Sequence, residues 1–202
     1  MSRAMALPAI VLFLVVAVGA AVPLLLNPVE VKDPCTVVDD LIASAESEVF
    51  DAAPQGWMPA RVQPGYEVTS DGGLSLEMVV AGRVNPEESR VELMRDLFVD
   101  GYMQEWEGAT DGVGFTAQRF ATGAGAKDFH AFANRFACQF ANETFPGPHG
   151  SIGLQIRYRG GDIGEQVSWV SGTTRILVSL IQDDAPPDHA KIEALAALVP
   201  QG

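Results

Sequence analysis

Residues 152–159 have the sequence IGLQIRYR, in which apolar side chains alternate with glycine, glutamine and arginine. This two-residue period predicts a β-strand with one core face and one polar face, the pattern typical of antiparallel sheets. The ranges 165–171 and 173–183 follow closely and predict two more strands. The last third of the chain therefore predicts an antiparallel sheet.

Other regions show apolar side chains at helical spacing. Thr36 and Asp39 form a capping box that opens a helix over 36–49. Asn85, followed by Pro86 and two glutamates, opens a helix over 86–107. Further helices are expected over 126–144 and 188–199, and further strands over 66–70, 74–84 and 112–122. The predicted fold class is α+β, with one N-terminal transmembrane helix and a single domain, residues 36–202, whose antiparallel sheet of about six strands is covered by about four helices.

The N-terminal region predicts a membrane anchor. Residues 4–26 carry no charged side chain, and as a helix they would reach about 34 Å, enough to cross a hydrocarbon core of about 30 Å. We interpret residues 1–26 as the anchor and 27–35 as a stalk, with signal cleavage near residues 18–21 as the alternative. Arg3 precedes the span, so the positive-inside bias places the N-terminus in the cytoplasm and the domain on the extracytoplasmic, periplasmic side of a single-pass protein in the cell membrane. The residues expected to allow close packing of the anchor in the bilayer are Pro8, Gly19, Ala20 and Ala21.

The two cysteines, Cys35 and Cys138, make one intramolecular pair. In an oxidising compartment they predict a disulfide, which would close a loop of about 100 residues and contribute up to roughly 4–5 kcal/mol. Two buried free thiols are the alternative. Lipid attachment at Cys35 is rejected, because residues 31–34 lack the small apolar side chains that lipoprotein signals require.

Charge and residue spacing exclude several function classes. The net charge of −13 argues against nucleic-acid binding. His130, His149 and His189 have no other histidine or cysteine at metal-ligand spacing. We expect no cofactor and no metal.

No catalytic constellation is evident either. The chain lacks the Gly-x-Ser-x-Gly turn of serine hydrolases. The spacing of Asp128, Glu143 and Glu165 does not bring any two of these carboxylates together as glycoside hydrolysis would require. We expect that the protein is not an enzyme.

Aromatic side chains offer a further lead, because their rings provide large contact areas with a polar handle. Trp106, at the end of the expected helix 86–107, is predicted to be half-exposed and able to dock a partner. Core packing is the alternative for all of them. The candidate partner or ligand contacts are Trp57, Tyr102, Trp106 and Trp169.

Three segments carry a resemblance to known proteins: 101–106 (GYMQEW), 119–122 (RFAT) and 125–126 (GA). Together they resemble actinobacterial single-pass, membrane-anchored extracytoplasmic α+β surface proteins, which include surface lipoproteins and kinase sensor domains. The chain departs from them in having one candidate disulfide instead of two. The resemblance implies an envelope protein without known catalysis, in a class that includes accessory subunits of actinobacterial respiratory supercomplexes.

The sequence thus leads to a hypothesis of function. The chain is expected to be a non-catalytic accessory subunit that binds an integral membrane protein complex, respiratory complexes included, through its anchor and acidic domain, with contact to the lipid bilayer. The alternative is an extracytoplasmic ligand-binding or sensor domain for an envelope lipid or glycan.

Overall fold

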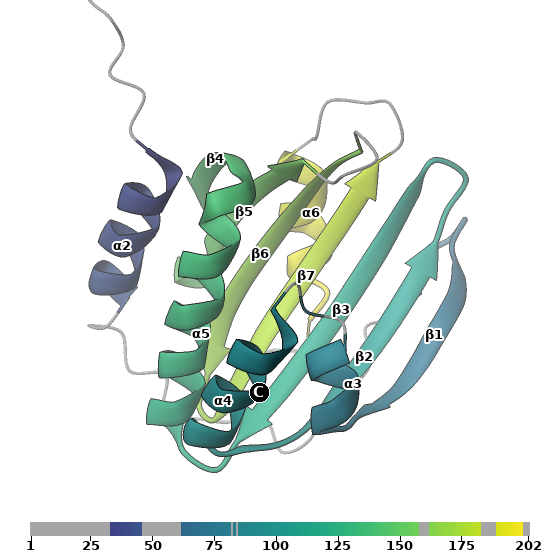
Figure 1. The fold of residues 1–202 in the computed structure, drawn as a ribbon. Helices are drawn as coiled ribbons and strands as arrows, with labels where there is room; N and C mark the ends of the chain where they lie inside the picture. Colours follow the sequence, from purple (N-terminus) through teal and green to yellow (C-terminus); the bar gives the residue numbers. More distant parts are fainter. Residues whose placement is uncertain are drawn as a thin grey trace, which may run out of the picture. The chain divides into compact units, whose positions relative to one another are not determined.

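Seven antiparallel strands form one sheet in the order β1-β2-β3-β7-β6-β5-β4 (Figure 1). The computed structural model describes residues 33–45, 62–81, 83, 85–157, 162–182 and 189–199. The strands are β1 (Glu67–Leu74), β2 (Phe98–Glu107), β3 (Asp111–Phe120), β4 (Ala141–Pro146), β5 (Ile152–Arg157), β6 (Ile163–Ser171) and β7 (Thr174–Gln182).

Helices cover both faces of this sheet. Four α-helices lie on one face and α6 lies on the other (Figure 1). The helices are α2 (Pro34–Ala45), α3 (Leu76–Ala81), α4 (Pro86–Arg95), α5 (Gly123–Ala137) and α6 (His189–Ala196), with short 3-10 turns η2 (Cys138–Phe140) and η3 (Pro148–Gly150). The α+β class predicted from the sequence is confirmed.

The expected membrane anchor lies outside the described residues, together with its packing positions Pro8, Gly19, Ala20 and Ala21 and the aromatic Trp57. In the ranges that are described, none of the helices has both the length and the apolar character needed to span a bilayer.

Three apolar clusters hold the helices on the sheet. The cluster under α6 contains Trp106, Phe115 and Val178. The cluster beneath α3, α4 and α5 contains Leu93 and Phe129. The third lies under α2, where the alternation that predicted β5 buries its core face: Ile152, Leu154 and Ile156.

The predicted hairpin over 66–84 is wrong. Gly72 and Gly73 do not reverse the chain; they pair with Met103 and Tyr102 and continue β1. Neither glycine adopts a positive φ. Because β2 offers a full row of backbone partners, the strand runs straight through the diglycine, and the chain then forms the short helix α3.

The predicted helix over 86–107 is also only half right. α4 starts as expected, with the Asn85 side chain accepting a hydrogen bond from the Glu88 amide, but it ends at Arg95. Leu97 then adopts a φ of 62° and redirects the chain into β2. Residues 98–107 contain three aromatic side chains and one valine, and they are paired on both sides, by β1 and β3. Tertiary pairing thus overrides a helical spacing that the same residues also satisfy.

The helix expected over 126–144 is α5, which begins earlier and ends earlier. The Thr122 hydroxyl accepts a hydrogen bond from the Gly125 amide at 3.0 Å and caps its first turn. After η2, residues 141–146 form the edge strand β4, which the prediction missed. The sequence did not predict β2 and β4, and the two strands of the predicted hairpin are one strand, β1. The sheet therefore has seven strands instead of the six that were predicted.

Candidate functional site

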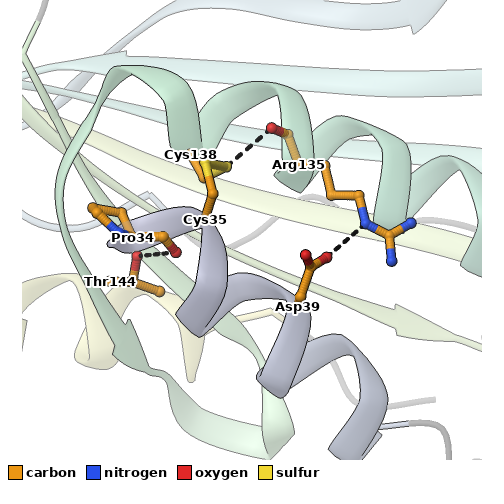
Figure 2. Close-up of a disulfide and its surroundings, with 6 residues drawn as sticks. All are labelled: Pro34, Cys35, Asp39, Arg135, Cys138 and Thr144. Carbon is orange, nitrogen blue, oxygen red and sulfur yellow. Dashed lines mark hydrogen bonds and ion pairs between the residues drawn. A yellow bond between two sulfur atoms is a disulfide. The ribbon is translucent and has the colours of Figure 1, made fainter. Parts of the chain in front are cut away.

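Cys35 at the start of α2 and Cys138 at the end of α5 form a disulfide, as predicted (Figure 2). Their Cα atoms are 5.1 Å apart and 103 residues separate them in the sequence. The Cys138 Sγ lies 3.0 Å from the Arg135 carbonyl oxygen. This is a contact only, because a disulfide sulfur carries no proton.

Two polar contacts reinforce the same junction. The Thr144 hydroxyl donates to the Pro34 carbonyl oxygen at 3.2 Å, and the Arg135 Nε donates to the Asp39 carboxylate at 2.7 Å (Figure 2). The Arg135–Asp39 pair is exposed, so it contributes little to stability. The covalent bond and the apolar cluster under α2 therefore hold this helix against α5 and β4.

Trp106 and Trp169, two of the tryptophans that the sequence singled out, are core side chains. Trp106, predicted to be half-exposed at a helix end, lies on β2 and is 1% exposed. Its ring packs against Tyr66 and Phe115, with centroid distances of 5.9 Å and 4.7 Å. Trp169 belongs to the same cluster and is 5% exposed. Both residues therefore have a packing role.

Tyr102 lies nearer the surface, on β2. It lines a hollow of about 700 Å³ at the β1–β3 end of the sheet. Apolar Leu74 and Leu76 share this hollow with the exposed ion pair between Arg119 and Asp100. Tyr102 also hydrogen-bonds to the Asp71 carboxylate. Of the aromatic candidates in the described ranges, Tyr102 is the one that stays available for surface contact.

An exposed apolar stripe on α4 is the clearest unoccupied surface. Val91 is 63% exposed, Met94 62% and Leu97 53%. We call these three residues the α4 patch. The helix buries the side containing Ser89 and Leu93. The described part of the chain therefore leaves this stripe uncovered.

Leu97 makes the α4 patch more unusual. It follows the end of α4 with its φ of 62°, and its carbonyl oxygen accepts a hydrogen bond from the Ala121 amide at 2.9 Å. This left-handed position is usually occupied by glycine, because a Cβ atom there costs roughly 1–2 kcal/mol. A large apolar side chain held there at the surface gains little from burial inside the domain. Such outliers cluster at functional sites.

One constellation of ionisable groups went unrecognised in the sequence. Glu165 on β6 is fully buried, and its Oε1 lies 2.6 Å from the His189 Nδ1. The His189 Nε2 lies 3.8 Å from Glu143 on β4. The register pairs both glutamates with Gln155, which explains how carboxylates 22 positions apart in the numbering share one histidine.

The chemistry of this constellation is limited. A buried carboxylate orients an imidazole well, but nucleophilic catalysis also needs a nucleophile in reach. Within the described ranges, no serine or cysteine side chain is hydrogen-bonded to His189. The same ranges hold no cluster of three side chains able to ligate a metal ion. We therefore assign no reaction to these three side chains. The contact between His189 and Glu165 connects the start of α6 to the sheet.

Comparisons with known proteins give one structural likeness. No protein family and no curated protein matches the chain. Among solved structures, the chain is similar to the extracellular domain of PknH from Mycobacterium tuberculosis, with a TM-score of 0.46 and 10% sequence identity over 87% of this chain and 93% of that one. At this level of superposition and identity, the likeness assigns no function.

Proposed function

We propose that this chain is a membrane-anchored, non-catalytic, extracytoplasmic interaction subunit that docks on an integral membrane protein through the α4 patch. The observation that carries the proposal is the uncovered stripe of Val91, Met94 and Leu97. Exposed apolar surfaces with a polar rim are typical of protein interfaces.

The sequence supplies the membrane part of the proposal. Residues 4–26 are long and apolar enough to anchor the chain. The Cys35–Cys138 disulfide fits an oxidising compartment outside the cytoplasm.

Charge favours a protein partner over the lipid surface itself. The chain has a net charge of −13, and the first turn of α4 carries Glu87 and Glu88 beside the patch. Anionic headgroups would repel such a surface, since membrane association of this type depends on lysine and arginine. A membrane protein with an apolar groove and a basic rim would complement it.

Leu97 supports a role in contact. The left-handed backbone lowers the stability of the free domain, and burial of the side chain against a partner would offset that loss in the complex. A partner that covers Leu97 thus gives a physical reason for leucine at a position where glycine is preferred.

The test is purification of the tagged full-length chain from detergent-solubilised membranes. We expect a stoichiometric complex with an integral membrane protein, and at least a tenfold loss of affinity in Leu97→Gly and Met94→Glu. Val68→Thr is the matched control, because Val68 is an exposed apolar residue on β1, 44% accessible, outside the patch. Recovery of the chain as a lone monomer would refute the proposal, and so would a complex whose affinity is the same in both patch variants as in the wild type.

A respiratory assembly is the specific partner class that the resemblance implies. Haem absorbance in the purified complex tests it directly. A complex without haem would exclude cytochrome-containing partners and leave the docking proposal standing.

A further inference from the structure

Two arginine side chains meet at one phenylalanine ring inside the domain. The Cζ atoms of Arg83 and Arg175 lie 5.6 Å and 5.8 Å from the centroid of the Phe129 ring. Arg175 is on β7 and only 2% exposed, whereas Arg83, in the segment between α3 and α4, is partly exposed. Phe129 is on α5, whose ribbon crosses the sheet beside α4 in Figure 1.

The hydrogen bonding of these guanidinium groups is incomplete. Arg175 Nη1 donates to the Gln118 Oε1 at 2.9 Å, but its buried Nε has no partner. The Arg83 guanidinium donates to no described residue, and neither arginine is paired with a carboxylate in the part of the chain that the structure describes.

Four arginines nearer the surface behave in the opposite way. Each of the following is paired with a carboxylate: Arg90, Arg95, Arg119 and Arg135. For these four, pairing occurs where solvent makes it weak, whereas a carboxylate is missing at Arg175, where burial makes it necessary.

Neighbouring polar groups do not supply a negative charge. Burial, with a smaller contribution from Arg175, lowers the pKa of His130 to about 3, so this imidazole is neutral at physiological pH. The nearby Asn134 amide donates to the His130 carbonyl oxygen and accepts from the Ser168 hydroxyl. These groups satisfy one another, and none of them gives the arginines a counter-charge.

The electrostatic cost of this arrangement is large. Burial, reinforced by the positive charge of Arg83, lowers the pKa of Arg175 to about 9, which still leaves the guanidinium charged at neutral pH. The aromatic ring offsets part of the cost, but an uncompensated buried charge needs a partner with negative charge.

We propose that Arg83 and Arg175 bind a phosphate-type oxyanion beside Phe129. A guanidinium presents a planar fork of donors that matches phosphate oxygens, and two such groups balance a dianion better than a carboxylate. Of the two guanidinium groups, Arg83 belongs to the more exposed residue and Arg175 to the more buried one. The oxyanion is free phosphate or the phosphate of a lipid headgroup. This site is separate from the α4 patch and does not depend on the proposed function.

Thermal unfolding of the full-length chain in detergent tests the site. Inorganic phosphate is titrated against sodium chloride at constant ionic strength, which removes general screening. We expect a saturable rise in Tm of about 5 °C or more at concentrations well above Kd. Arg175→Met and Arg83→Gln should abolish this rise, and Arg119→Gln, which changes an exposed arginine on β3, should keep it.

A second readout separates binding from packing. Without phosphate, the double variant Arg175→Met/Gln118→Leu should have a higher Tm than the wild-type chain, because it removes a buried charge without a carboxylate partner together with the buried amide that it hydrogen-bonds. If that variant does not fold, Arg83→Gln decides the test, since its side chain is partly exposed.

Two ligands distinguish the sources of the oxyanion. A shift with inorganic phosphate supports a free phosphate site, and a shift with glycerol 3-phosphate alone supports the phosphomonoester of a lipid headgroup. No shift with either ligand above the chloride baseline, or a shift that survives in both arginine variants, would overturn the inference. Leu97→Gly should retain the phosphate response, so failure of the docking proposal and failure of this one are separable.

Discussion

Removing the Cys35–Cys138 bond should destabilise the whole domain. The two cysteines are 103 residues apart in the sequence. In the chain-entropy treatment, a crosslink closing a loop of about 100 residues lowers the conformational entropy of the unfolded chain enough to contribute about 4.7 kcal/mol at 25 °C. A compact unfolded ensemble reduces this, so we expect a loss of about 3–4 kcal/mol in the free energy of unfolding.

The assay is urea unfolding of the full-length chain, followed by tryptophan fluorescence, for wild type and for the double variant Cys35→Ala/Cys138→Ala. Alanine is preferable to serine because Cys138 is 3% exposed and a serine hydroxyl there would be buried. Reduction of the wild-type chain is the matched control, since it breaks the bond and keeps both sulfurs.

The competing outcome is local. If α2 is held only by the bond, the variant would lose protection from protease in residues 34–45 while the urea midpoint of the rest stays unchanged. A global loss below about 1 kcal/mol with such local cleavage would refute the reasoning that the crosslink acts on the unfolded chain.

Three further predictions follow from the geometry. Leu97→Gly should raise the free energy of unfolding by about 0.5–1 kcal/mol, measured in urea, because glycine adopts a positive φ without strain. The pKa of His130 is lowered to about 3 in the fold and is about 6.5 in the unfolded chain, so the unfolded state binds the proton first and stability should fall below pH 6.5. His130→Gln should remove about 2–3 kcal/mol of that fall at pH 4, measured by urea unfolding at each pH. Gly153→Ala should lower Tm through a loss of about 1–3 kcal/mol, because its Cβ would lie 2.3 Å from the Phe145 ring; Gly72→Ala, with no atom in contact range, is the control and should change Tm little.

Local chemistry explains which parts of the fold could be predicted. Strict alternation over 152–157 and the cap at Asn85 identified β5 and the start of α4, because both signals depend on neighbouring residues only. The disulfide followed from two cysteines and an expected compartment. The end of α4 could not be predicted, since residues 98–107 suit either a helix or a strand until β1 and β3 supply hydrogen-bond partners.

The candidate sites were harder to predict than the fold. Trp106 was assigned to the surface because its helix was extended too far. The Arg83 and Arg175 pair left no sequence signal, because these residues come from a connecting segment and a strand.

The sequence by itself determined the class of the domain, the anchor-like composition of residues 4–26 and the pairing of Cys35 with Cys138. These follow from local period, length and cysteine number. Only the tertiary structure decided which side of α4 stays uncovered and which charged groups meet around Phe129. The physical reason is that exposure and charge pairing depend on side chains brought together from distant strands and helices, which no local pattern encodes.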